Sequence, residues 1–173
     1  IGAGDSLFCL AACGNTTYTS TVLLEARKRG ATTIGMANNP ETALLSGADI
    51  PILLSTPPEV IAGSTRLGAG TAQKIALNMM STLMGVLLGH VLDGLMVNVI
   101  ANNEKLFRRA EDIVMQVTGC ERSTAAISLK ETSGSVKEAA LIASGAKDYG
   151  EALNLLESSD GNLRTALKTL QSA

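Results

Sequence analysis

Three short apolar runs in the first 54 residues constrain the fold most strongly. The runs at 6–12, 31–37 and 50–54 have the length of strands, and segments with helical spacing separate them at 17–28 and 41–46. Strands that alternate with helices form right-handed units with a parallel sheet, and ligands gather where those strands end. The first run is apolar throughout, which predicts a strand buried on both faces. We therefore expect an α/β fold.

The rest of the chain, from about residue 64, shows helical spacing and no further strand pattern. We expect a long helix or a broken pair of helices over 64–98, and another helix over 103–118 with Asn103 as a possible N-cap. The stretch 75–100 is apolar enough to suggest a membrane span, but polar side chains and glycines recur within it. This pattern favours a buried or dimer-interface helix in a soluble protein.

The tail contains a weak internal repeat with a spacing of 27 residues. Residues 125–139 recur as 152–166, and each copy reads as a helix, a turn centred on Gly134 or Gly161, and a second helix. The pattern is similar to small ubiquitin-associated bundles, but any pair of short antiparallel helices can produce it. We interpret the tail as a helical subdomain for packing or dimer contacts.

Composition excludes several classes of function. Aromatic residues make up 2% of the chain and the net charge is -2, which argues against binding to nucleic acid. The three cysteines show no CxxC spacing and His90 is the single histidine, so we expect no metal site and no cofactor. A small molecule or another protein is the expected partner, in a reducing, cytoplasmic setting without a membrane.

The loop after the first predicted strand, residues 12–17, is the first candidate site. It contains Cys13, Gly14, Asn15 and Thr16 and leads into a predicted helix. Backbone N–H groups and hydroxyls at a helix start can hold a phosphate. The alternative is an ordinary turn in which a threonine caps the helix and no ligand binds.

The second candidate site is the stretch 59–74. Ser64 or Thr65 is expected to cap the helix that follows, while its free N–H groups and Arg66 favour an anion. Glu59 is the main acid/base candidate, because it follows a predicted strand and stands beside the Gly63 turn. A capped helix without a ligand and a surface glutamate are the alternatives.

Residues 58–79 resemble the signature of the N-acetylmuramic acid 6-phosphate etherases, which are sugar isomerase (SIS) domain proteins related to the glucokinase regulatory protein. The matching residues are Pro58-Glu59, Gly63-Ser64-Thr65-Arg66, residues 69–74 and Asn78-Met79. The resemblance implies a partial SIS-type, flavodoxin-like parallel sheet. Residues 1–100 would be the C-terminal part of an SIS domain, and 101–173 the helical subdomain.

The resemblance also implies roles for the candidate residues. Gly14, Asn15 and Thr16 would border the phosphate, while Glu59, Ser64 and Thr65 would lie near the sugar. The first loop departs from the family pattern, because Cys13, Asn15 and Thr17 stand where the family has serine, arginine and proline. The lost hydroxyl and cation are expected to weaken phosphate binding, unless Cys13 serves as a substitute ligand.

The implied activity is that of a lyase in cell-wall recycling. It would release D-lactate from N-acetylmuramic acid 6-phosphate and leave N-acetylglucosamine 6-phosphate, with a homodimer as the expected assembly. The family's main catalytic glutamates lie upstream of the part matched here, so we expect the chain to be a fragment or a truncated relative. The alternatives are a non-catalytic phosphosugar sensor and a structural dimer module.

Overall fold

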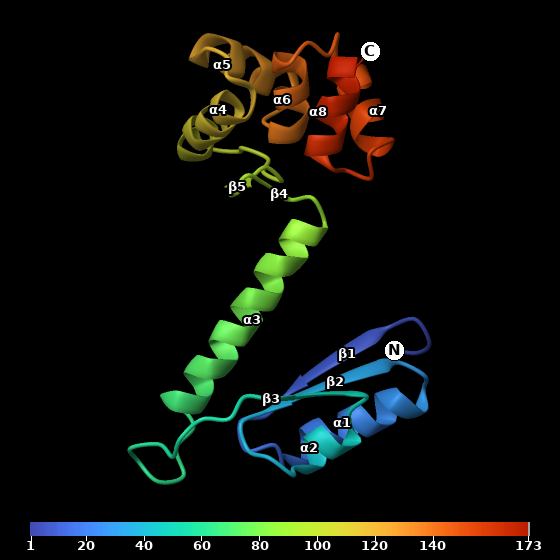
Figure 1. The fold of residues 1–173 in the computed structure, drawn as a ribbon, viewed down its shortest axis with the longest axis vertical. Coiled ribbons are helices and arrows are strands. Elements are labelled where there is room, and N and C mark those ends of the chain that lie inside the picture. The colour runs from blue at the N-terminus through green and yellow to red at the C-terminus, as the bar shows by residue number, and fades with distance from the viewer. Residues whose placement is uncertain (173) are drawn as a thin grey trace. The chain divides into compact units, whose positions relative to one another are not determined.

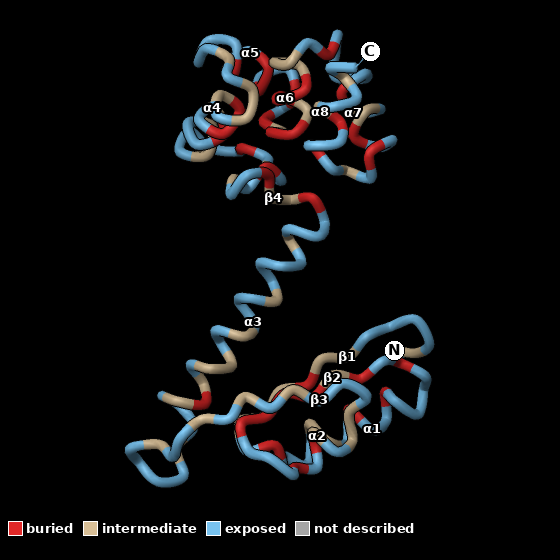
Figure 2. The backbone as a smooth tube through the Cα atoms, in the orientation of Figure 1, coloured by how far each residue is buried: buried red, intermediate tan, exposed pale blue. Residues whose placement is uncertain are grey.

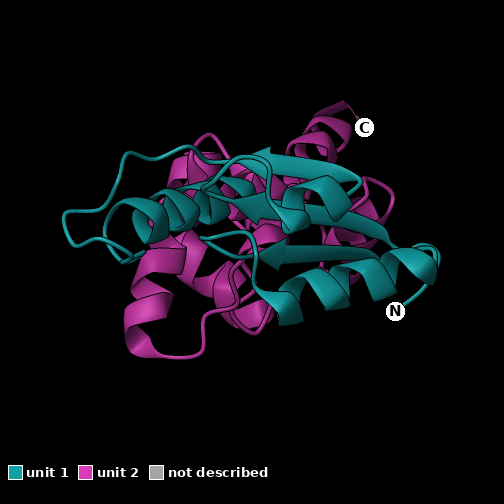
Figure 3. Ribbon diagram, turned by 90° about the horizontal axis from the view of Figure 1, so that it is seen from below, with its two compact units in different colours: residues 1–80 teal, residues 81–173 magenta. Residues whose placement is uncertain are grey.

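The computed structural model describes residues 1–172, which fall into two compact units divided between Met80 and Ser81 (Figure 3). The first unit contains a three-stranded sheet with two helices and the start of a longer helix. Its elements are β1 (Ser6–Leu10), α1 (Thr17–Lys28), β2 (Thr32–Ala37), α2 (Ala43–Gly47), β3 (Ile50–Leu53) and α3 (Gly68–Leu87), the last of which continues past the boundary.

The sheet is parallel, with the strand order β1-β2-β3. Ser6 pairs with Thr32, and Ile34 pairs with Ile50. When neighbouring parallel strands follow one another in the chain, right-handed connections place the intervening helices on one face of the sheet. Figure 1 shows α1 and α2 together on that face. The predicted α/β architecture is therefore confirmed.

The prediction that the first strand is buried on both faces is wrong. Of the residues in β1 only Cys9 is buried, at 6% exposure, and Ser6 is exposed. Among residues 1–172, β1 is an edge strand, and α1 and α2 cover one face of the sheet. An uninterrupted apolar run therefore does not guarantee two covered faces.

Asp49 fastens the sheet to α1 at the end opposite the candidate loops. Its Oδ2 accepts hydrogen bonds from the backbone N–H and the hydroxyl of Thr33, at 2.9 and 2.7 Å, and its Oδ1 lies 2.9 Å from Arg27 Nε. The hydrogen bond from the Thr33 hydroxyl, the Thr33 N–H and the charge of Arg27 lower the pKa of the Asp49 carboxyl.

A short hairpin follows α3, so the prediction of no further strand is wrong. β4 (Val91–Leu92) and β5 (Leu95–Met96) pair antiparallel. Asp93 and Gly94 form the turn with φ angles of 48° and 80°. An Asp-Gly pair is a strong signal for a two-residue hairpin turn, because both positions need positive φ. Across residues 1–172, no helix combines the length and apolarity that crossing a membrane requires.

The second unit packs five helices around one apolar core. Buried residues recur along all five helices (Figure 2). Asn103 is the N-cap of the first, since its Oδ1 accepts a hydrogen bond of 2.9 Å from the N–H of Leu106. The helices are α4 (Glu104–Thr118), α5 (Arg122–Glu131), α6 (Val136–Ala143), α7 (Tyr149–Glu157) and α8 (Leu163–Ser172).

The two copies of the repeat adopt the same turn. Gly134 and Gly161 have φ angles of 86° and 71°, and each donates its N–H to the last turn of the preceding helix, at 2.7 Å to Leu129 O and 2.8 Å to Leu156 O. These are the αL geometries that favour glycine after a helix. The division of the chain near residue 100 into an SIS part and a helical subdomain stays a prediction.

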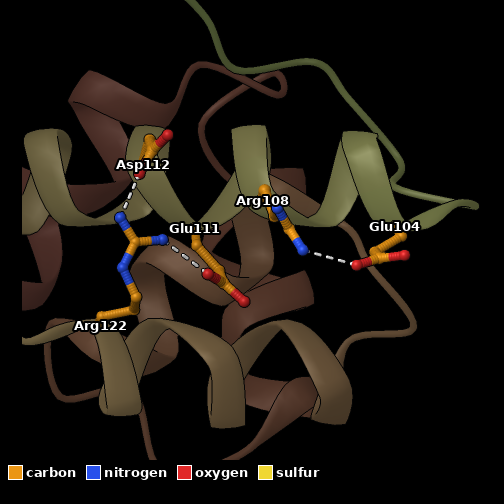
Figure 4. A network of polar contacts seen from close by, with 5 residues as sticks. All are labelled: Glu104, Arg108, Glu111, Asp112 and Arg122. Atoms are coloured by element: carbon orange, nitrogen blue, oxygen red, sulfur yellow. Dashed lines mark hydrogen bonds and ion pairs between the residues drawn. The ribbon is translucent and has the colours of Figure 1, made fainter.

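Ion pairs join α4 and α5 at the surface of the second unit (Figure 4). Arg122, at the start of α5, pairs with Glu111 at 2.7 Å and with Asp112 at 2.5 Å. Within α4, Arg108 pairs with Glu104 one turn earlier, at 2.7 Å. These side chains are mostly solvent-exposed and already paired with each other, so they contribute to helix orientation more than to ligand binding.

Candidate functional site

The helix α1 begins without a side-chain cap. Its N-cap residue is Thr16, but the Thr16 hydroxyl makes no capping hydrogen bond and lies 3.5 Å from the Sγ of Cys13. The first turn of α1 contains no acidic residue. Its backbone N–H groups and the positive end of its dipole are therefore available to an anion from outside the chain.

Gly14 allows the loop to lie directly on the start of α2. The residue is buried and has a φ of 75°. A Cβ added here would lie 2.4 Å from Thr42 Oγ1 and 2.6 Å from Thr42 Cβ, which is too close for real atoms. The Thr42 hydroxyl is itself buried and has no hydrogen-bond partner within residues 1–172. Both the backbone conformation and the close approach require glycine.

Asn15 has a structural task in addition to its predicted role at the phosphate. Its Oδ1 accepts a hydrogen bond of 3.0 Å from the N–H of Ala43, the first residue of α2. Thr42 is the N-cap of α2 but does not cap it with its side chain, so Asn15 takes over that function from a distant part of the chain.

Cys13 is exposed at the end of the same loop, and its thiol is more acidic than that of an ordinary cysteine. The hydrogen bond with the Thr16 hydroxyl lowers the pKa of Cys13 most, and hydrogen bonding with the Asn15 backbone adds to this. The thiolate therefore forms more readily than in an ordinary cysteine, at a position where the resemblance implies a substitute for a serine hydroxyl.

Glu59 caps α3 from nine residues upstream. Its Oε1 accepts hydrogen bonds from the N–H groups of Gly68, at 2.9 Å, and Ala69, at 3.1 Å. A carboxylate of the chain itself therefore fills the position in which we predicted an anion.

The prediction that Ser64 or Thr65 caps the helix is wrong. Both residues lie in the turn that precedes α3, whose first residue is Gly68. The Ser64 hydroxyl accepts a hydrogen bond of 3.4 Å from the N–H of Arg66, still within that turn. The intervening residues carry the two hydroxyls away from the helix end and leave the capping position to Glu59.

A cavity of about 490 Å³ in the first unit brings the two candidate loops together. Cys13 lines one part of it, and Glu59, Ser64 and Thr65 line another. Gly14, Asn15 and Thr16 do not line the cavity but follow Cys13 directly, at the start of α1. The cavity lies where the strands end, which is the usual ligand position in parallel sheets.

Two further cavity residues, Asn38 and Asn39, were not predicted as site residues. The Nδ2 of Asn39 donates a hydrogen bond of 3.4 Å to the carbonyl of Cys13. Both asparagines follow β2, the strand next to β1. Their position directly after a predicted strand is the sequence feature that would have indicated them as site residues. Within residues 1–172, no three His, Cys, Asp or Glu side chains are grouped so that they could hold a metal ion.

Comparison with known proteins identifies a group of similar sequences. The chain is 45% identical over 167 residues to an N-acetylmuramic acid 6-phosphate etherase of Deinococcus radiodurans, in an alignment that covers 96% of this chain and 55% of that protein. Etherases of the same name from Symbiobacterium thermophilum and Streptomyces avermitilis are 49% identical over 136 residues and 44% identical over 165 residues. Those two alignments cover 79% and 95% of this chain.

No protein-family model matches the chain. The two further alignments cover 45% and 53% of the Symbiobacterium and Streptomyces proteins, so the chain spans about half the length of the relatives it matches. The identity nevertheless extends over nearly the whole of this chain and recurs in relatives from several species. By sequence, the chain is similar to the N-acetylmuramic acid 6-phosphate etherases over nearly its whole length and about half of theirs.

Proposed function

We propose that the protein acts on N-acetylmuramic acid 6-phosphate as a carbon–oxygen lyase that releases D-lactate and leaves N-acetylglucosamine 6-phosphate. The observation that carries this proposal is the 45% identity to an etherase of that name over 96% of the chain. The cavity beside the open start of α1 supports it, because a phosphorylated sugar needs an anion site next to a polar cavity.

The phosphate is proposed to bind at the start of α1. Gly14 lets the backbone come close, and the first-turn N–H groups supply donors in place of a cation. Asn15 and Thr16 border the anion, although Asn15 also caps α2. Cys13 lies between the phosphate and the sugar, and Ser64 and Thr65 are proposed to bind sugar hydroxyls from the other wall of the cavity.

Glu59 is proposed to take part in proton transfer only through Oε2, because Oε1 is held by two N–H groups of α3. Its fixed position is an advantage for a group that must meet a substrate proton at short range. Elimination of lactate needs a base and an acid. We expect the further acid/base groups in the part of the related etherase sequences that this chain does not span.

A homodimer in the cytoplasm is also part of the proposal. α3 exposes several large apolar side chains, among them Met79 at 60%, Leu83 at 58% and Leu87 at 84%. An exposed apolar helix surface of this kind is typical of an interface. Molar mass measured by light scattering is expected to equal two chains, and a mass of one chain would contradict the dimer.

An assay of lactate release tests the proposed activity. The purified protein is incubated with N-acetylmuramic acid 6-phosphate, and lactate is measured with a lactate dehydrogenase readout. Binding of N-acetylglucosamine 6-phosphate is measured in parallel by calorimetry, with unphosphorylated N-acetylglucosamine as the control. Lactate release is expected. Binding without turnover would replace the lyase by a phosphosugar sensor, and absence of binding would overturn both.

A double substitution, Ser64→Ala with Thr65→Ala, tests the placement of the sugar. Neither hydroxyl caps α3, so the helix should remain intact while affinity for the sugar phosphate falls. Inorganic phosphate serves as the matched ligand, since it has no sugar ring. Equal loss of affinity for both ligands, or for neither, would contradict the assignment of Ser64 and Thr65 to the sugar.

A further inference from the structure

Asn38 is a buried polar residue in the wall of the candidate cavity, with 4% of its surface exposed. It follows β2 directly. Its Nδ2 donates a hydrogen bond of 2.9 Å to the carbonyl of Leu54, and its Oδ1 accepts one of 2.9 Å from Nε2 of Gln73. Its backbone N–H donates to the carbonyl of Ala12 at 3.0 Å.

These bonds reach all the segments that carry the candidate site residues. Ala12 opens the loop that leads to Cys13 and the start of α1, and Leu54 opens the segment that leads to Glu59. Gln73 lies in α3, and Ala69, whose carbonyl is 3.5 Å from Asn38 Nδ2, lies in its first turn. One residue thus connects the ends of the strands to the helix that Glu59 caps.

We infer that Asn38 is a positioning residue of the site. By holding Leu54 O and Gln73 at once, it sets the distance between the loop of Cys13 and the wall formed by Glu59, Ser64 and Thr65. This inference rests on the proposed function, since it concerns the binding of the same sugar phosphate. Asn38 acts through these groups, because the polar atoms of its side chain are already bonded to protein.

The amide is chemically required in this role. An asparagine presents a donor and an acceptor on one short planar group, which no apolar side chain of similar size can do. Without it, the carbonyl of Leu54 and the Nε2 of Gln73 lose their partners. The two walls would then shift, and a displacement of about 1 Å can lower the rate of a catalysed reaction on the order of 100-fold.

The test compares ligand affinity with stability in the purified protein. Asn38→Ala is expected to weaken binding of N-acetylglucosamine 6-phosphate by at least about tenfold, measured by calorimetry at a temperature where the variant is folded. Leu23→Ala is the matched control, because Leu23 is fully buried in α1 but does not line the cavity. It should lower the unfolding temperature and leave affinity unchanged.

A second pair of variants separates positioning from folding. Gln73→Ala removes only the hydrogen bond between Gln73 Nε2 and Asn38 Oδ1, and its effect on affinity should not add to that of Asn38→Ala, since Asn38→Ala already breaks this bond. Asn38→Asp introduces a carboxyl that offers a donor and an acceptor only when protonated. Burial beside two carbonyls raises the pKa of such a carboxyl, so affinity relative to wild type should recover as the pH falls.

Each outcome has a definite meaning. Wild-type binding that Asn38→Ala leaves unchanged would overturn the inference alone. The inference also fails if Leu23→Ala loses affinity in proportion to its lost stability. Any loss of stability would then weaken binding, and the effect of Asn38→Ala would be explained by folding alone. No binding of the sugar phosphate by the wild-type protein would overturn the proposed function, and this inference with it.

Discussion

The helices α1 and α3 both begin near the strand ends of one sheet, yet only α3 has a carboxylate at its first turn. α1 has no side-chain cap, because the Thr16 hydroxyl faces Cys13. α3 is capped by the carboxylate of Glu59, which accepts hydrogen bonds from two of its N–H groups. A helix start can therefore attract an external anion only where the chain has not supplied one itself.

The difference assigns separate tasks to the two loops. The loop before α1 leaves backbone donors free and is suited to the phosphate of a ligand. In the loop before α3, the charge of Glu59 is bound to the helix start. This loop is suited to form a fixed wall of the cavity, which includes Ser64 and Thr65. We therefore propose that residues 59–74, which resemble the etherase signature, position the ligand more than they bind its charge.

Gly14→Ala should have the largest effect, because it distorts the loop that leads into the uncapped start of α1. The new Cβ would collide with Thr42 and the φ of 75° would be strained. We expect a loss of roughly 2–5 kcal/mol in the free energy of unfolding, measured with urea, and loss of detectable sugar phosphate binding. Gly63→Ala is the matched control, since a Cβ there meets nothing within 4 Å and only the φ of 80° is strained.

Adding Thr42→Gly to Gly14→Ala shows whether the collision or the backbone strain dominates. Thr42 supplies all three atoms nearest to the added Cβ. The double variant should recover about 1–3 kcal/mol relative to the sum of the single variants. Strict additivity would mean that the contact between Gly14 and Thr42 is unimportant.

Glu59→Ala should convert the start of α3 into one like that of α1. Loss of the cap is expected to lower the free energy of unfolding by about 1–2 kcal/mol. Because the N–H groups of Gly68 and Ala69 become free, sulfate should raise the unfolding temperature of the variant more than that of the wild type. An identical response to sulfate in both proteins would contradict the view that Glu59 occupies an anion position.

Much of the fold can be predicted because its signals are local. The helix predicted at 17–28 has the bounds of α1, since Thr16, two basic residues and Gly30 mark its ends. The hairpin at 91–96 escapes prediction, because strands of two residues are too short for a periodic pattern and only the Asp93-Gly94 pair indicates the turn.

The candidate site is predictable in outline but not in its capping. Cys13, Glu59, Ser64 and Thr65 follow predicted strands, and in the structure all four line one cavity, while their roles toward a ligand stay a prediction. Local capping rules relate residues three positions apart, whereas Glu59 acts nine and ten residues downstream and Asn15 acts 28 residues downstream. Such contacts depend on the path of the chain through the sheet, which no local pattern records.

Asn15→Ala and Asn15→Asp separate the two tasks of this residue. Asn15→Ala removes the cap of α2 and should cost about 1 kcal/mol in the free energy of unfolding. Asn15→Asp keeps an oxygen for Ala43 N–H and should stay near wild-type stability. Its added negative charge beside the open start of α1 should nevertheless weaken sugar phosphate binding. Equal affinity in Asn15→Asp and wild type would place the phosphate away from Asn15.

Thr16→Val should have the smallest effect, and it probes the open helix start through Cys13. The Thr16 hydroxyl stabilises the thiolate and lowers the pKa of Cys13. Removal of the hydroxyl raises this pKa and therefore reduces the fraction of thiolate at any pH below the pKa. The rate of alkylation by iodoacetamide should fall a few-fold at neutral pH and converge with wild type at high pH. Peptide mass mapping separates Cys13 from Cys9 and Cys120, and Thr17→Val is the neighbouring control. Because Thr16 does not cap α1, stability should hardly change, and a large loss would show that its hydroxyl caps the helix in solution.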